Sequence, residues 1–256
     1  MTGERALELQ HEDGGDDRAP DGDARVHTHL FRGYSGAMGY RSPRALARFA
    51  KVGIVLVLLA QALLLLAIGA EAAVLGVPIE QAPPEDPATG LVGLGMCCSG
   101  LTSIGALIAS ATVFLMWLHR AYSGAQAMGA MLSYSPGYAV GSWFIPFINC
   151  VVPMQVVQAL DVASARDDEL ESTFRSPDIV VWWVLWLGSN FIGTVSARLA
   201  EHTGTTAALV IECGVLLMRI GAAVLLIRII GRITDNLDRK ANALMPGAVP
   251  TAPLTF

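Results

Sequence analysis

The chain alternates between long apolar runs and short polar segments. Four apolar runs are unbroken, at residues 52–74, 91–118, 179–197 and 207–230. Each is long enough, at a rise of about 1.5 Å per residue, to cross a hydrocarbon core about 30 Å thick as an α-helix. The pattern predicts an all-α integral membrane protein in which residues 41–240 form a bundle of four spanning helices.

A fifth apolar block, residues 135–160, contains Pro146 and Pro153. Each proline removes a backbone donor and clashes with the turn before it. Within a membrane, such irregular backbone is tolerated only where protein buries it or where it lines a wet cavity. We therefore expect a re-entrant or interfacial element packed against the inner side of the bundle, with Tyr138, Trp143 and Phe144 at the level of the lipid headgroups.

The basic residues predict which ends of the helices face the cytoplasm. The loop at residues 75–90 contains acidic residues but no lysine or arginine, so the positive-inside rule places it outside. If the block at 135–160 crossed the membrane fully, a fifth span would put the basic C-terminal flank outside, against the same rule. Four spans place both termini in the cytoplasm. The flanking basic residues are Arg41, Arg44, Arg48, Lys51, Arg228, Arg232, Arg239 and Lys240.

Composition supports the membrane class, because 53% of the residues are hydrophobic and only 15% are charged, outside the range of ordinary soluble domains. Residues 1–40 are acidic and hold too little apolar surface to order themselves, so we expect a disordered cytoplasmic tail there. Residues 241–256 are expected to form a flexible tail. The net charge of −5 implies no nucleic-acid partner. The excess of arginine over lysine suggests a bacterial protein, and thus a cytoplasmic-membrane location.

Small residues recur along the second apolar run. Gly95, Ser99 and Ser103 lie four residues apart, and Ala106 and Ser110 continue a similar surface. Small side chains let helix backbones approach closely in lipid, where packing replaces the hydrophobic effect as the driving force. This stripe indicates a packed bundle rather than a binding site.

The last apolar run contains two ionisable residues, Glu212 and Arg219, seven residues apart and so on one helical face. An ionised group at mid-membrane costs about 2.5–3.5 kcal/mol even on lenient insertion scales, so each needs a partner or a wet cavity. Desolvation can also keep a carboxyl such as Glu212 protonated. Gln61 and Asn190 are the nearest candidates by depth. The residues either relay protons or ions, or join helices with Arg219 capped by carbonyls or by Glu212; the structural interpretation is favoured.

Further polar candidates lie near the inner ends of the runs. Asn149 either lines a polar pocket with the carbonyls freed by Pro146 and Pro153, or caps the membrane interface. His119 and Arg120 resemble a phosphate or headgroup contact, although topology alone places basic residues at that depth. The sequence has no nucleophile elbow, zinc-protease motif or phosphate-binding glycine loop, so it supports neither a catalytic activity nor a metal or cofactor.

Three segments of the chain resemble a known family. They are FLMWLHRAYSG from Phe114, YSPGYAVGSWFIPFINCVVPMQVVQAL from Tyr134 and WWVLWLGSNFIG from Trp182. Together they are similar to the domain of unknown function 4328 family of bacterial membrane proteins, over the four runs and the block between them. The resemblance implies a multi-pass membrane protein and supplies no activity.

The most specific part of this resemblance begins at Ser135 and centres on Pro146 and Asn149. Members of the family often carry an arginine before the second proline of the block and an aromatic residue after it. This chain has Val152 and Met154 at those positions, and Gly124 where an asparagine is frequent. For this reason no site is carried over from the family.

The favoured function is a non-enzymatic membrane scaffold or accessory subunit, because nearly all irregular and charged sequence is assigned to one side of the bilayer. Its expected partners are the lipid bilayer and a membrane or cytoplasmic protein, with a homo-oligomer as a further alternative. The rival function is a small transporter, or an ion- or proton-conducting oligomer, that uses Glu212 and Arg219 with Gln61 and Asn190. A weaker third option is an intramembrane enzyme that acts on lipid, with the broken block as its pocket.

Overall fold

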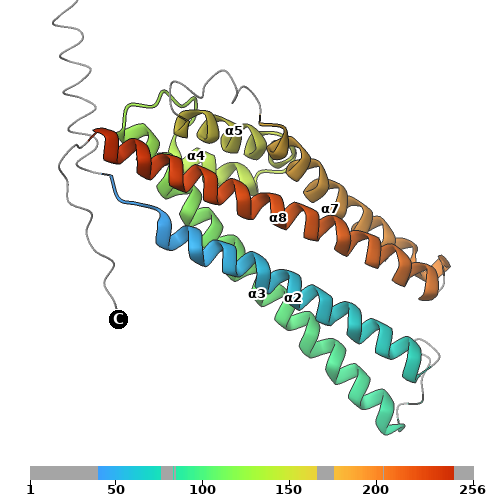
Figure 1. Ribbon diagram of the computed structural model, residues 1–256. Helices are drawn as coiled ribbons and strands as arrows, with labels where there is room; N and C mark the ends of the chain where they lie inside the picture. Colours follow the sequence, from blue (N-terminus) through green and yellow to red (C-terminus); the bar gives the residue numbers. More distant parts are fainter. Residues whose placement is uncertain (1–39, 76–82, 84, 166–175, 204, 245–256) are drawn as a thin grey trace, which may run out of the picture.

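The computed structural model describes residues 40–75, 83, 85–165, 176–203 and 205–244. The predicted tails at 1–40 and 241–256 therefore lie largely outside the described residues. Four helices are long and apolar enough to cross a membrane. They are α2 (Arg44–Val74), α3 (Pro87–Ala127), α7 (Pro177–Thr203) and α8 (Thr205–Leu244). These helices form two hairpins, α2 with α3 and α7 with α8, joined where α2 packs along α8 (Figure 1). The predicted all-α, four-span membrane bundle is confirmed.

The proline-containing block folds into short helices, none of which is a candidate span. These are α4 (Pro136–Gly141), the 3-10 turns η2 (Ser142–Phe144) and η3 (Ile148–Cys150), and α5 (Val152–Ser164). Even α5, with 13 residues, is only about 20 Å long. In Figure 1 these helices lie at the end of the bundle where α2 begins and α8 ends. How deeply the block enters a bilayer stays a prediction.

The prolines of the block begin helices and mark the turn between them. Pro136 and Pro153 occupy the first turns of α4 and α5, where a missing backbone N–H removes no helical hydrogen bond. The Ser135 hydroxyl caps α4 by accepting a hydrogen bond from the Tyr138 amide at 3.2 Å. Pro146 lies between η2 and η3, and the next residue, Phe147, has a φ of 65°. The irregular backbone predicted from the prolines is thus concentrated in one short turn.

Helix boundaries differ from the apolar runs, because hydrophobicity marks the membrane crossing and not the end of the helix. At the α4/α5 end, α2 starts eight residues before the run and α8 continues fourteen residues beyond it. The polar link expected between the last two spans, containing Arg198, Glu201 and His202, is mainly helical. It belongs to α7, which ends at Thr203, and α8 starts again at Thr205.

The core of the described chain lies at the α4/α5 end, where the short helices cover the four long ones. Its largest fully buried side chains include Trp117, Tyr122, Leu160, Trp182 and Leu237. Towards the other end, large apolar side chains on all four long helices are exposed, as expected for surfaces that face lipid. The largest fully buried side chains are therefore concentrated near the α4/α5 end of the bundle.

In the lipid half, α2 and α3 meet through the small residues of the second apolar run. The Ser103 hydroxyl donates to the Ala60 carbonyl at 3.1 Å, and Ser110 packs against Gly53. A Cβ added at Gly53 would lie 3.0 Å from Ser110 Oγ. Two members of the small-residue stripe thus form the close backbone contact that such residues permit in lipid.

Ion pairs tie the helix ends together at the α4/α5 end. Arg44 pairs with Asp238, whose carboxylate also accepts hydrogen bonds from Tyr40 at 2.7 Å and from Ser42 at 3.0 Å. Burial and the adjacent Asp238 carboxylate raise the pKa of Tyr40 above its ordinary value, so the phenol remains a donor at neutral pH. The Tyr40 ring lies over Gly124, where a Cβ would be 2.9 Å from Tyr40 Cε2.

Candidate functional site

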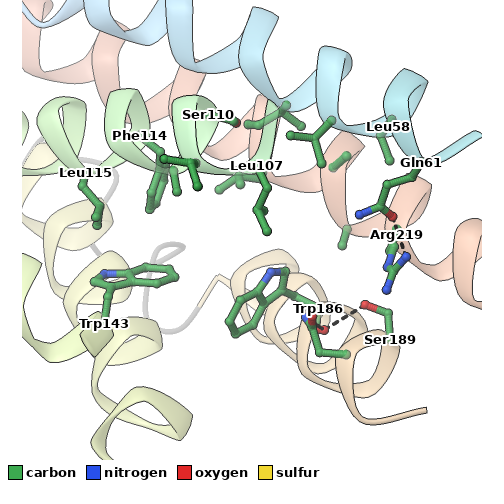
Figure 2. A pocket seen from close by; sticks show the side chains of 18 of the residues that line it. Leu58, Gln61, Leu107, Ser110, Phe114, Leu115, Trp143, Trp186, Ser189 and Arg219 are labelled. Atoms are coloured by element: carbon green, nitrogen blue, oxygen red, sulfur yellow. Dashed lines mark hydrogen bonds between the residues drawn. The ribbon is translucent and has the colours of Figure 1, made fainter. Parts of the chain in front are cut away.

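A cavity of about 510 Å³ lies inside the bundle, within the size range of small-molecule pockets. It lies beside the α2–α8 contact, with α3 on one side and α7 on the other (Figure 2). Its walls are mainly apolar and aromatic. The wall residues labelled in the figure include Leu58, Leu107, Phe114, Trp143 and Trp186. Polar side chains also line it, namely Gln61, Ser110, Thr112, Asn149, Ser189, Asn190 and Arg219.

Arg219 is the charged residue among those that line the cavity. Its Nη1 donates a hydrogen bond to Gln61 Oε1 on α2, which joins the two helix hairpins (Figure 2). Gly193 on α7 leaves room for the guanidinium, because a Cβ there would lie 3.3 Å from Arg219 Nη2. The guanidinium is thus held between α2, α7 and α8.

Arg219 lies near the middle of the span. Arg232 forms ion pairs at the α4/α5 end. Arg219 precedes it by 13 residues, which is about 20 Å along α8. At that depth an ionised side chain costs about 2.5–3.5 kcal/mol on the lenient scales. Gln61 offers a neutral oxygen, which satisfies one donor without placing a negative charge beside the guanidinium.

Glu212 forms no ion pair with Arg219, although its carboxylate lies close enough to act on the guanidinium at longer range. Seven residues separate it from Arg219, which is about 10 Å along the helix axis and away from the α4/α5 end. None of the ion pairs between described residues joins the two side chains, and Glu212 does not line the cavity. Direct capping of Arg219 by Glu212 is therefore not seen among the described contacts, and a longer-range role for the Glu212 charge stays a prediction.

The structure does bring four of the sequence candidates to one cavity: Gln61, Asn149, Asn190 and Arg219. Asn190 Nδ2 donates to the Trp186 carbonyl at 2.7 Å, and the Ser189 hydroxyl donates to the same carbonyl at 2.9 Å. Asn149 comes from the turn η3 and closes the cavity at the α4/α5 end. Three amides and one guanidinium, together with three hydroxyl side chains, therefore interrupt mainly apolar walls.

The other candidates lie elsewhere. Pro146 and Pro153 do not line the cavity and instead shape the backbone of the block. His119 is exposed on α3, and Arg120 donates through Nε to the Arg41 carbonyl at 3.3 Å. Both belong to the surface at the α4/α5 end, which is the place that topology alone predicts for basic residues.

Sequence reasoning missed the aromatic wall of the cavity. The Trp143 ring meets Trp186 edge-on, with centroids 6.0 Å apart, and meets Phe114 edge-on at 5.3 Å. The Trp183 indole N–H donates to the Cys150 carbonyl at 2.9 Å and so fixes the block against α7. The segment WWVLWLGSN contained a signal for this wall, since residues 182, 186, 189 and 190 recur at helical spacing.

The lining of the cavity is suited to holding a small molecule. The described part of the chain contains no group of three His, Cys, Asp or Glu residues able to hold a metal ion. The cavity combines aromatic walls with a desolvated cation, and these features complement an amphipathic molecule that carries negative charge.

A family model described as "Domain of unknown function (DUF4328)" matches residues 93–235. The matched segment includes most of α3, the whole proline-containing block, α7 and most of α8. All the polar cavity residues except Gln61 lie within it. Neither a curated protein nor a solved structure matches the chain.

Proposed function

This chain belongs to the DUF4328 family, and we propose that it is a non-enzymatic membrane protein that binds an amphipathic anion within its helical bundle. One observation carries the proposal: Arg219 lines a cavity near mid-membrane, and its hydrogen-bond partner there is the neutral Gln61. An anionic group beside Arg219 would form the direct ion pair that the described residues do not supply, in a medium of low dielectric constant where opposite charges attract strongly. The aromatic walls would hold the apolar body of the same ligand.

The proposed ligand enters from the membrane. Ile108 and Phe144 both line the cavity, yet their side chains are 62% and 72% exposed. Because these side chains face both the cavity and the surroundings of the bundle, the cavity has an open side towards lipid. A molecule dissolved in the bilayer would reach Arg219 without crossing the ion pairs at the α4/α5 end.

Replacing Arg219 by glutamine tests this proposal. The purified full chain, in detergent, is titrated with the fluorescent fatty acid cis-parinaric acid and with the corresponding uncharged fatty alcohol. We expect Arg219→Gln to weaken binding of the acid by about tenfold or more, equal to about 1.4 kcal/mol, and to leave binding of the alcohol nearly unchanged. Glutamine keeps hydrogen-bonding capacity and removes only the charge.

The matched control is Arg198→Gln, which removes an exposed arginine near the far end of α7. It should bind both probes as the unmodified chain does. If the fatty acid and the alcohol bind equally well to the unmodified chain, or if Arg219→Gln with unchanged helicity binds the acid normally, the proposal is wrong.

Binding is favoured over conduction by the extent of the cavity. Its lining runs from Asn149 and Phe144 at the α4/α5 end to Gln61 and Arg219, and it does not include Glu212 further along α8. Trp143 links the cavity wall to η2 and so to the block that follows. An occupied cavity could therefore be sensed by a protein partner at that end, as an accessory subunit requires. The accessory role, a homo-oligomer and a transporter role all stay predictions.

We further propose that the α4/α5 end faces the cytoplasm of a bacterial cell, with both termini on that side. The support is the gathering of arginines and lysines at the start of α2 and the end of α8. Glu85, before α3, and Met131, between α3 and α4, are exposed at opposite ends of the bundle. They provide two sites for labelling.

In a cysteine-free background, an impermeant thiol reagent added to intact cells should label Glu85→Cys and should leave Met131→Cys unlabelled until the cells are opened. The reason is that the reagent reaches only residues on its own side of the membrane. The opposite pattern, with Met131→Cys labelled in intact cells, would reverse the proposed orientation.

A further inference from the structure

A second cationic feature lies on the outside of the α2–α8 contact. The Lys51 side chain of α2 lies over Gly231 of α8, where a Cβ would be 2.9 Å from Lys51 Nζ and 3.7 Å from Cε. Gly231 lacks a side chain, so the lysine rests directly on the helix backbone. No described carboxylate forms an ion pair with Lys51, although Arg44, further along α2, pairs with Asp235 and Asp238.

Two exposed arginines flank this lysine. Arg48 precedes Lys51 by three residues on α2, and Arg228 precedes Gly231 by three residues on α8. Residues three apart are neighbours on a helix surface, so the three cations gather around Gly231. Among the described residues, neither arginine takes part in an ion pair. This group, Arg48, Lys51 and Arg228, is called the outer basic cluster below.

The outer basic cluster lies at the depth of lipid headgroups. Lys51 immediately precedes the first apolar run, and Arg228 lies in the last turn of the fourth run. Towards the membrane interior, exposed apolar side chains continue on the same two helices: Val55 on α2 is 44% exposed, and Val224 on α8 is 43% exposed. The cations therefore lie at the headgroup end of an exposed apolar surface that suits an acyl chain.

This surface is separate from the cavity. The cavity residues of α8 are Arg219, Ala222, Ala223 and Leu226. At about 100° per residue, Arg228 points to the side of α8 opposite Arg219. Binding at one place therefore requires no occupant at the other.

We propose that the outer basic cluster binds the phosphate of an anionic phospholipid in the leaflet at the α4/α5 end. Arginine and lysine are the side chains that recognise phosphate, arginine through paired N–H donors and lysine as a point charge. A lipid is favoured over a free phosphate compound because exposed valines lie beside the cations on the side of the membrane interior. These valines can contact an acyl chain, which a free phosphate compound lacks. The lipid would thus be held by its headgroup and one chain.

Lipid retention by the full chain tests this proposal. The protein is purified in detergent, incubated with an equimolar mixture of phosphatidylglycerol and phosphatidylcholine, and the bound lipid is measured by native mass spectrometry. We expect phosphatidylglycerol to be enriched on the unmodified chain, and Lys51→Gln/Arg228→Gln to reduce that enrichment by about tenfold. Because Arg228 is exposed, the single variant Arg228→Gln tests the same effect without a risk to folding.

Controls separate this site from the Arg219 cavity and from non-specific charge. Arg198→Gln should retain the phosphatidylglycerol enrichment, and in an Arg219→Gln background the change Lys51→Gln/Arg228→Gln should still reduce it by the same factor, which separates lipid at the cluster from any lipid in the cavity. Lys51→Arg should also retain it, because the charge is kept. Three results would overturn the proposal: equal retention of the two lipids by the unmodified chain, normal enrichment in the double variant, or displacement of the lipid by millimolar glycerol phosphate.

Discussion

Arg232→Met is expected to be among the most destabilising single changes in the described chain, lowering the free energy of unfolding by about 3 kcal/mol. Arg232, on α8, donates to Asp161 of α5 through Nε at 3.0 Å and Nη2 at 3.1 Å. It also donates to Asp178 of α7. Asp161 is only 2% exposed, so the change would leave a buried carboxylate whose other donor is the Ser176 hydroxyl at 2.6 Å.

The expected loss in free energy of unfolding lies at the lower end of the range for broken buried ion pairs, because the Arg232 side chain is 37% exposed and partly screened by solvent. Unfolding in detergent, followed by circular dichroism during a titration with sodium dodecyl sulfate, would measure the loss. Arg228→Met, four residues earlier on the same helix and exposed, is the matched control and should change stability by less than about 0.5 kcal/mol.

A second change separates the role of charge from that of packing at this position. Adding Asp161→Asn to Arg232→Met removes the orphaned charge and should recover part of the lost stability. Equal stability of the Arg232→Met and Arg228→Met variants would show that the ion pairs of Arg232 with Asp161 and Asp178 do not hold α5 to α7 and α8.

Gly53→Val is expected to lower the free energy of unfolding by about 1–3 kcal/mol, the usual cost of inserting extra atoms into a packed contact. A Cβ at Gly53 would lie 3.1 Å from both Cα and Cβ of Ser110, so the strain falls on the backbone of α3 as well as on a side chain. Rotation of one side chain cannot relieve it. The helices α2 and α3 would have to separate where small residues hold them together in lipid.

The same detergent unfolding measurement checks this prediction. Gly100→Val provides the matched control, because Gly100 is also a helical glycine but has no atom within 4 Å of an added Cβ. Its stability should stay within about 1 kcal/mol of the unmodified chain. An equal effect of the two substitutions would mean that the close approach at Gly53 does not contribute to the bundle.

The candidate site was predictable only in part. Depth in the membrane suggested Gln61 and Asn190 as neighbours of Arg219, and the structure places both at its cavity, with Gln61 as the direct partner. The depth of a residue in the membrane increases by about 1.5 Å with each position along a helix, so it can be counted from the sequence. Glu212 forms no direct ion pair with Arg219 and acts on it only at longer range, because periodicity gives the face of a residue but not whether two turns of separation can be bridged.

The contact of Trp143 with the aromatic residues of α7 could not be found by such counting. Trp143 and Trp186 are 43 positions apart, and their edge-on contact depends on how the turn between η2 and α5 packs on α7. Read alone, Trp143 was assigned to the headgroup level, as amphipathic rings usually are. Its contact with a ligand-sized cavity depends on neighbours that no local pattern specifies.

The sequence by itself determined that this protein is a four-span helical membrane bundle with a proline-broken block between the second and third spans. The reason is that a bilayer imposes a length and an apolar composition on each crossing, and prolines impose irregular backbone. Only the tertiary structure decided that Arg219 faces a cavity with Gln61, and that Arg232 joins Asp161 to Asp178. Those contacts depend on the rotation and crossing of helices far apart in the chain, and in lipid these are set by side-chain packing rather than by hydropathy.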